Sequence, residues 1–381
     1  MMDRRQFTVL MGASVLAGCQ STAQGTAQGS GAIRPANRAA ASQRFQPVKN
    51  AGFDAWVEGA YGRARAKGIS NRTLKRARPT IGFLPEVVKV DRNQTEFKRS
   101  FEDYLAIATS ENRVATGRAM LRQYAGLLDR IERQYGVEKE VVTAVWGLES
   151  RYGTRKGDVP TLSALGTLAY DGRRGNLFER QFQAALKILD NGDIAPAQML
   201  GSWAGAMGHT QFMPTSYLSF AVDFDGDGAR NIWGADPTDA LASAAAYLNR
   251  NGWRKGARWG QESANGAVVP GGANGPRFDK GPNYRVLGRY NNAQKYIIGV
   301  GILSDLLAGR PGLRHEFGPD ANGMRLKDRI ALQKGLARAG YDVGEPDGVI
   351  GPKTLAAIRA FEQAQGLAVT GRPTMALLSR L

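Results

Sequence analysis

A glutamate near the end of an apolar helical segment is the first candidate for acid–base chemistry. Val141, Val145 and Glu149 fall on one face of a helix with 3.6 residues per turn. Gly153 offers the left-handed conformation that ends a helix, so Glu149 lies near the C-terminal end, where the helix dipole disfavours negative charge. Burial and the dipole therefore both favour the neutral carboxylic acid, which is the form that a general acid needs.

A structural role for this glutamate is the alternative. A buried carboxylate paired with Arg151 or Arg155 would also be perturbed, so this segment alone supports the two interpretations equally. The stretch from Gly205 to Tyr217 shifts the balance toward the catalytic interpretation, because it completes a recognisable pair of motifs.

The two motifs resemble those of the lytic murein transglycosylases, most closely the membrane-bound transglycosylase B family. The first reads WGLESRYG at residues 146–153, and the second reads GAMGHTQFMPTSY at residues 205–217. The resemblance extends over residues 53–307. It implies a lysozyme-like, mainly helical fold with Glu149 as the single catalytic glutamate in a cleft.

The same resemblance implies roles for residues around the glutamate. Ser202 matches a serine that hydrogen-bonds the carboxyl group, and Arg173 and Arg174 match a basic pair at the cleft. The residues that match the lining of the sugar subsites are Gln211, Tyr247, Tyr290, Asn291 and Tyr296. Outside the two motifs, the alternative for each is an ordinary core or surface residue, since single aromatic side chains on helices usually pack.

The reaction that the resemblance implies needs one carboxyl group and no cofactor. A two-carboxylate hydrolase requires a second Asp or Glu to attack the sugar or to activate water. In a lytic transglycosylase, Glu149 would protonate the oxygen between MurNAc and GlcNAc and then accept the proton of the C6 hydroxyl, giving a 1,6-anhydromuramyl end. The alternatives are a hydrolytic muramidase on the same fold and a non-catalytic wall-binding lipoprotein.

An acidic loop is a candidate site for Ca²⁺. Asp223, Asp225 and Asp227 occupy the first, third and fifth positions of a pattern that resembles the start of an EF-hand loop, and Ala229 would offer a carbonyl oxygen. The twelfth position is a glycine where a bidentate Glu is usual, so Asp236 or Asp239 would have to close the site. The alternative is a turn shaped by Asp side chains without a metal.

The N-terminus has the order of an export signal. Arg4 and Arg5 precede an apolar run, and LAGC at residues 16–19 resembles a lipobox, which predicts a signal peptide over residues 1–19 and lipidation of Cys19, the only cysteine. The arginine pair also resembles a twin-arginine motif. Residues 20–44 predict a flexible tether. The expected location is the periplasm, with Gln20 favouring attachment to the outer membrane.

We predict a mainly α protein with two folded domains. Apolar residues recur at helical spacing in segments such as 114–135, 138–152 and 238–251, which places a catalytic domain at residues 45–309 with a small irregular or β insertion in its Gly-rich stretch. Residues 310–323 read as a linker. Residues 324–381 resemble a three-helix peptidoglycan-binding domain, through DGVIGPKT and the later Gly and Thr positions.

The charge and composition restrict the partners. The formal net charge is +17, but the basic residues are dispersed and no nucleic-acid-binding module is recognisable, so peptidoglycan and anionic lipid are better candidates than nucleic acid. Only His209 and His315 are present, which argues against a His-based metal site or a Ser-His-Asp hydrolase. Other cell-wall enzymes are further candidate partners.

Overall fold

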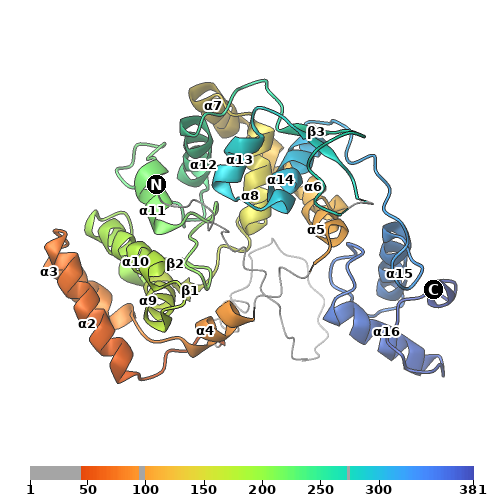
Figure 1. Cartoon of the computed structure of the whole chain (residues 1–381), viewed down its shortest axis with the longest axis horizontal. Helices are drawn as coiled ribbons and strands as arrows, with labels where there is room; N and C mark the ends of the chain where they lie inside the picture. The colour runs from red at the N-terminus through yellow and green to blue at the C-terminus, as the bar shows by residue number, and fades with distance from the viewer. Residues whose placement is uncertain (1–43, 94–98, 273–274) are drawn as a thin grey trace, which may run out of the picture. The chain divides into compact units, whose positions relative to one another are not determined.

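The computed structural model describes residues 44–93, 99–272 and 275–381 (Figure 1). The expected signal peptide, Cys19 and all of the tether except residue 44 lie outside these ranges. The described residues form two compact units, one of residues 44–93 and 149–247, the other of residues 99–148 and 248–381.

The first unit is built around α9 (Thr161–Asp171) and α10 (Gly175–Asp190), which lie side by side in Figure 1. Every residue of α9 from Thr161 to Ala169 is buried, as expected of a helix enclosed by others. The helices that pack on this pair are α2 (Ala51–Ala66), α3 (Asn71–Ala77), α4 (Pro85–Arg92) and α11 (Pro214–Phe220). Two short 3-10 helices, η1 (Arg78–Thr80) and η3 (Pro196–Gln198), join these elements.

The second unit is centred on α14 (Gln294–Leu307), which is apolar almost all round. Trp259 contacts this helix so closely that a Cβ on Gly301 would lie 2.2 Å from its ring. The helices around α14 are α5 (Phe101–Ala108), α6 (Glu111–Gln123) and α13 (Tyr284–Tyr290), and α7 (Ala125–Tyr135) packs on α6.

Two helices cross the division of the chain into units. The boundary between the units falls between Leu148 and Glu149 in α8 (Lys139–Ser150), and between Tyr247 and Leu248 in α12 (Thr238–Arg250).

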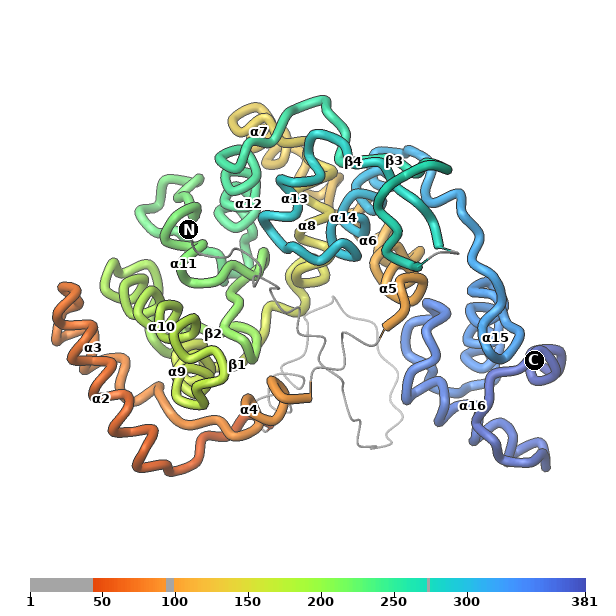
Figure 2. The backbone as a smooth tube through the Cα atoms, viewed as in Figure 1, coloured from red at the N-terminus to blue at the C-terminus, as the bar shows by residue number. Residues whose placement is uncertain are grey.

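Strands within the described residues are few and short. In the first unit, β1 (Val159–Pro160) pairs antiparallel with β2 (Leu200–Gly201). In the second unit, β3 (Gly260–Glu262) pairs antiparallel with β4 (Phe278–Lys280), and the tube of Figure 2 shows the two side by side. This second pair lies in the Gly-rich stretch, so the predicted small β insertion is present.

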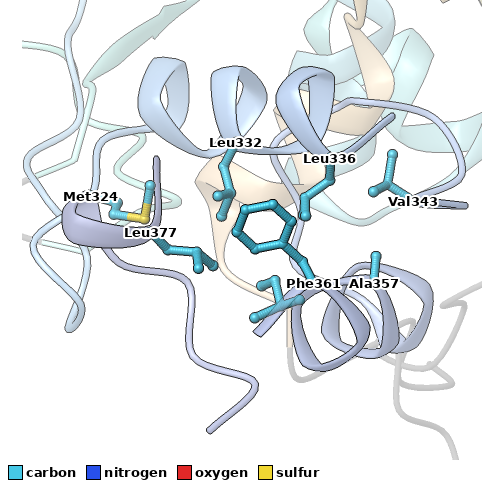
Figure 3. Close-up of a cluster of buried hydrophobic side chains, with 8 residues drawn as sticks. Met324, Leu332, Leu336, Val343, Ala357, Phe361 and Leu377 are labelled. Atoms are coloured by element: carbon cyan, nitrogen blue, oxygen red, sulfur yellow. The ribbon is translucent and has the colours of Figure 1, made fainter. Parts of the chain in front are cut away.

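The C-terminal residues have a hydrophobic core of their own. Helices α15 (Leu326–Arg338), α16 (Pro352–Ala364) and α17 (Met375–Leu378) surround it. Figure 3 shows the side chains of this cluster converging between the three helices. The cluster consists of Met324, Leu332, Leu336, Val343, Ala357, Ile358, Phe361 and Leu377.

Polar contacts join this C-terminal domain to α5 and α6 of the same unit. Arg329 on α15 is only 3% exposed, and its guanidinium lies 3.1 Å from Glu102 on α5 and 3.2 Å from Asp320. Ser110, which caps α6, donates a 2.6 Å hydrogen bond to Glu345. The domain is therefore docked through charged and polar side chains.

The predicted helical architecture is confirmed, with two differences in detail. The segment 114–135 forms two helices because Tyr124 leaves the helical region, and its ring packs edge-on against Trp146, 5.7 Å between centroids. The helix expected to reach residue 152 ends at Ser150. None of the helices within the described ranges combines the length and the apolar character that crossing a bilayer requires.

Candidate active site

Glu149 is the penultimate residue of α8 and is partly buried, whereas Val141, Val145 and Trp146 on the same helix are buried. Directly after the helix, the backbone enters the left-handed conformation. Arg151, Tyr152 and Gly153 have φ angles of 49°, 56° and 83°. Two of these three residues carry a Cβ, so this turn stores strain of about 1 kcal/mol or more at each of them.

Ser150 holds this strained turn. Its hydroxyl accepts a 3.0 Å hydrogen bond from the N–H of Gly153 and donates a 2.5 Å hydrogen bond to the carbonyl of His209. Its own carbonyl accepts the N–H of Arg155 at 2.8 Å. The residue that follows Glu149 therefore connects the end of α8 to the second sequence motif.

The second motif forms a tight hairpin beside β1 and β2. Met207 and Phe212 exchange both backbone hydrogen bonds, at 2.9 and 3.0 Å, and Met207 also forms a bridge to Gly201 of β2. Gly208 has a φ of 71°, and a Cβ there would lie 2.2 Å from the carbonyl oxygen of Ile232, so only glycine fits. Gln211, at the end of the turn, has a φ of 51°.

Lys156 and His209 meet at the loop of residues 231–234. The Lys156 ammonium donates to the carbonyl oxygens of Trp233 and Gly234, at 2.7 and 2.5 Å. His209 Nε2 lies 2.9 Å from the same Gly234 oxygen and therefore carries the proton there. Asn231 shapes this loop, because its Oδ1 accepts the N–H groups of Trp233 and Gly234 at 3.0 Å each.

The imidazole of His209 is held neutral. Burial and the nearby charge of Lys156 lower the pKa of His209 from its ordinary value of 6.5 to about 4, although the hydrogen bond to Gly234 and the charge of Asp236 act in the opposite direction. His209 thus has a structural function in this site.

The predicted subsite residues of the first unit lie on the hairpin and around it. The Gln211 amide donates to the carbonyls of Lys156 (3.0 Å) and Gly208 (2.8 Å). The Ser202 hydroxyl accepts the N–H of Ala206 at 3.1 Å, which leaves its own proton available to another acceptor. The partly buried ring of Tyr247 packs on Phe220 and Phe212, with centroids 4.5 and 5.8 Å apart.

The predicted subsite residues of the second unit are grouped at the junction of α13 and α14. Tyr290 ends α13, and Asn291 follows it with an Oδ1 that accepts the N–H of Ala293 at 3.0 Å. The rings of Tyr290 and Tyr296 are nearly parallel, with centroids 6.4 Å apart and planes inclined by 13°. Tyr296 and Asn291 are buried, and Tyr290 is partly exposed.

Arg173 and Arg174 both bind Asp91, a buried residue of α4. Arg173 Nε donates to one carboxylate oxygen at 2.7 Å, and a guanidinium nitrogen of Arg174 donates to the other at 2.8 Å. The hydrogen bond that Arg173 donates to Asp91 raises the pKa of Arg173 above its ordinary value. The basic pair thus fastens α4 to the start of α10, a role that the sequence did not indicate.

The acidic loop brings three of the predicted ligands together. One carboxylate oxygen from each of Asp223, Asp225 and Asp227 lies within 4.8 Å of the others. Both oxygens of Asp223 accept backbone N–H groups, from Gly226 at 2.7 Å and Gly228 at 2.9 Å. Desolvation acts to raise the pKa of Asp223, but these N–H donors outweigh it and lower that pKa. Three hard oxygen donors at this separation fit the ligand preference of Ca²⁺.

Asp239 and Ala229 have other contacts in this loop. The carboxylate of Asp239 accepts the N–H groups of Phe224 and Asn231, both at 2.8 Å, and Ala229 N–H donates to Asp227 at 2.8 Å. Burial raises the pKa of Asp239 above its ordinary range, against the opposing effect of the two N–H donors. The Asp239 carboxylate therefore holds the two ends of the loop together by accepting these two backbone N–H groups.

The fold is mainly helical, with a partly buried glutamate in the last turn of a helix. Comparison with protein families identifies its class. Residues 52–266 match the transglycosylase SLT domain, and residues 325–381 match a peptidoglycan binding domain. The first match covers more than half of the chain, so the chain belongs to the SLT transglycosylase family and carries a peptidoglycan-binding domain at its C-terminus.

Two bacterial relatives show how far this similarity extends. SltB3 of Pseudomonas aeruginosa, solved with NAG-NAM-pentapeptide, is 38% identical with a TM-score of 0.68, over 87% of this chain and 100% of that chain. The same protein with NAG-anhNAM-pentapeptide gives a TM-score of 0.66. The membrane-bound lytic murein transglycosylase B of Escherichia coli is 40% identical, but the match spans only 38% of this chain and 39% of that relative.

A third relative was solved with a bound metal. The lytic transglycosylase Slt35 of Escherichia coli, solved in complex with calcium, matches with a TM-score of 0.58 and 27% identity, over 68% of this chain and 93% of that chain. These comparisons confirm the lytic transglycosylase family and the lysozyme-like fold that the sequence predicted.

Proposed function

We propose that this chain cleaves the bond between MurNAc and GlcNAc in peptidoglycan without water and leaves 1,6-anhydromuramyl ends. The observation that supports this most directly is the position of Glu149, in the last turn of α8 and followed by the strained turn that Ser150 holds. The related SltB3 has been solved with an NAM-containing and with an anhNAM-containing fragment, and the second carries the anhydro end that this reaction would leave.

The proposed chemistry uses Glu149 twice. Its carboxyl group donates a proton to the glycosidic oxygen as the bond from that oxygen to C1 of MurNAc breaks, and the substrate's N-acetyl group stabilises the developing positive charge. The carboxylate then accepts the proton of the C6 hydroxyl while that oxygen forms a new bond to C1. The proton gained in the second step replaces the proton given in the first, so no second catalytic carboxylate is required.

Replacing Glu149 with Gln tests this assignment. The amide keeps the size of the side chain but neither donates nor accepts the proton, so we expect release of anhydro products to fall at least about a hundredfold, the lower end of the range for general acid–base catalysis. Mass spectrometry of digested sacculi measures it, with circular dichroism as the control for folding. Near-normal anhydro release by the variant would refute the assignment, and reducing ends from the wild type would indicate a hydrolytic muramidase instead.

Residues that would contact the glycan are proposed for each unit by itself. Ser202 would hydrogen-bond the Glu149 carboxyl group, since its hydroxyl proton is available, and Gln211 and Tyr247 would contact the glycan in the first unit. In the second unit, Tyr290, Asn291 and Tyr296 are the proposed contacts. Because Arg173 and Arg174 already bind Asp91, their proposed part at the cleft is to fix α4 and α10.

We further propose that the acidic loop binds Ca²⁺ as a structural ion. Asp223, Asp225 and Asp227 would supply side-chain oxygens and Ala229 its carbonyl, while Asp239 shapes the loop through Phe224 and Asn231. The calcium complex of the related Slt35 supports this. The ion would stabilise the loop and take no part in the chemistry. Calorimetric titration with Ca²⁺ tests the site, and absence of heat and of a thermal shift at millimolar Ca²⁺ would remove it.

The proposed setting is the periplasm, with the chain anchored to the outer membrane by lipid on Cys19 and extended by the tether of residues 20–44. The membrane-bound E. coli relative supports a membrane-attached protein. The C-terminal domain, proposed at residues 324–381 after a linker at 310–323, would bind peptidoglycan strands, while residues 45–309 perform the cleavage. Other cell-wall enzymes remain proposed partners.

A further inference from the structure

Lys156 contacts backbone carbonyls of a different loop, and its ammonium also lies 3.4 Å from His209 Nε2. Its ammonium donates to Trp233 and Gly234, and its own carbonyl accepts the amide of Gln211. A lysine with two backbone acceptors at 2.7 and 2.5 Å is fixed in place, whereas most lysines are solvated and mobile. All of these residues belong to one unit, together with Glu149.

We propose that Lys156 is a positioning residue for the reaction. It holds three segments in fixed positions relative to one another: the turn of residues 150–157, the turn of residues 208–211 and the loop of residues 231–234. It thereby fixes the orientation of the Glu149 side chain. This inference rests on the proposed function of Glu149, and it assigns Lys156 no contact with the substrate.

Three links carry the effect from Lys156 to Glu149. The first is the pair of bonds from the ammonium to the 231–234 loop, to which His209 also donates. The second is the carbonyl of His209, which accepts the hydroxyl proton of Ser150. The third is covalent, because Ser150 directly follows Glu149. Each link is a hydrogen bond with a good distance or a peptide bond, so displacement at the loop is transmitted to the helix end.

The strain in these turns explains why such a fastening is needed. Arg151, Tyr152 and Gln211 all have positive φ angles, between 49° and 56°, and relaxing any of them would move the end of α8 or the hairpin. Non-glycine residues persist in this conformation only when their surroundings over-determine them. The ammonium of Lys156 supplies charge-assisted hydrogen bonds at the point where the three segments meet.

Lys156→Met is the direct test. The substitution keeps the length and removes the two donations, so we expect kcat for soluble peptidoglycan oligomers that contain a NAM–NAG bond to fall about tenfold or more, since small displacements of catalytic groups cost that much, while KM changes less than threefold. Lys156→Arg should recover most of the loss, because a guanidinium can donate to both carbonyls. Lys75→Met, at an exposed position of α3, is the matched control and should leave kcat unchanged.

A double-mutant cycle with Ser150→Ala identifies the route. If Lys156 acts through Ser150, the two substitutions together should lower kcat by much less than the product of their separate effects, because the second removes a link that the first has already loosened. Multiplicative effects would contradict the proposed route. All rates are measured below the melting temperature of the least stable variant, and an unchanged kcat in folded Lys156→Met would overturn the proposal.

Hydrogen exchange separates this inference from the proposed function. In Lys156→Met, the amides of Gly153 and Phe212 should exchange at least tenfold faster than in the wild type, whether or not the wild type forms anhydro ends. Unchanged exchange rates at these two amides would refute the proposal that Lys156 holds these turns in place. A wild type that yields no anhydro ends but shows the faster exchange on substitution would refute the proposed function and leave the fastening intact.

Discussion

His209 shows how a buried residue in the site makes stability depend on pH. Its side chain is 3% exposed and donates to the carbonyl of Gly234, and Lys156 and Asp236 are the charged groups that act on it. Protonation would place a second positive charge beside Lys156 in a poorly solvated space. His209 therefore binds a proton less readily in the folded protein than in the unfolded chain.

The stability that depends on His209 should be lost as the pH falls from about 6.5 to about 4. In that window the unfolded chain binds the proton and the folded chain does not, so falling pH favours unfolding. The lowered pKa of His209 corresponds to a loss of about 3 kcal/mol in the free energy of unfolding at low pH. Urea unfolding at pH 7 and pH 4 measures it.

His209→Gln is the control for this pH effect, because the amide can still donate to Gly234 but does not titrate. We expect the variant to lose about 3 kcal/mol less stability than the wild type between the two pH values. Equal losses in both proteins would show that other groups, such as the carboxylates of the acidic loop, cause the pH dependence.

Candidate site residues were easier to name from the sequence than their contacts were to predict. Glu149 and Gln211 lie in motifs of recognisable spacing, so the sequence alone marks them. Lys156 has no such signal, because its acceptors are backbone carbonyls some 80 residues away in the chain. Asp91 was missed for a similar reason, since a single aspartate on a short helix looks like a solvated residue until Arg173 and Arg174 reach it.

Helices were well predicted where their apolar periodicity is strong, and least well where a bond between segments determines the end. The sequence places the end of α8 at Gly153, but the helix stops at Ser150, because the Ser150 hydroxyl binds Gly153 and His209 and stabilises two further residues in the left-handed region. The two short strands β3 and β4 have no alternation long enough to predict them individually.

The interaction between α15 and α5 depends on one buried charge. Arg329 lies among Glu102, Asp103 and Asp320, at 3.1, 3.8 and 3.2 Å, and it also donates to the carbonyl of Gly348 at 2.8 Å. Replacing Arg329 leaves three partly buried carboxylates close together without compensation. The helix pair is therefore sensitive to this single residue.

Arg329→Met should destabilise the full chain by about 1 to 3 kcal/mol, less than the cost of breaking a fully buried ion pair, because the carboxylates left behind are partly exposed. Arg338→Met, at an exposed position on the same helix, is the control variant. It should change stability by no more than about 0.5 kcal/mol. Urea unfolding provides both values. If the two variants were equally stable, the Arg329 cluster would have no net stabilising effect.

At the scale of the whole molecule, the C-terminal domain combines its own core with a polar docking surface. Its hydrophobic cluster lies entirely within residues 324–377, so the domain does not need α5 or α6 to form its core. The contacts to those helices are made by Arg329 with Glu102, by Ser110 with Glu345 and by Lys334 with Glu111. Water can solvate every one of these groups when the two surfaces separate.

Deleting residues 325–381 should therefore disturb the catalytic part less than the single substitution of Arg329 disturbs the full chain. Deletion returns Glu102 to water, where its charge is solvated, whereas Arg329→Met keeps it covered without a partner. We expect the truncated protein to cleave soluble peptidoglycan fragments at close to the wild-type rate and to bind isolated sacculi more weakly, because the proposed wall-binding domain raises the local concentration of substrate. Pull-down and fragment assays on the same preparations measure both effects. Sacculus binding equal to that of the full chain would contradict the binding role, and loss of fragment cleavage would show that the docked domain supports the catalytic site directly.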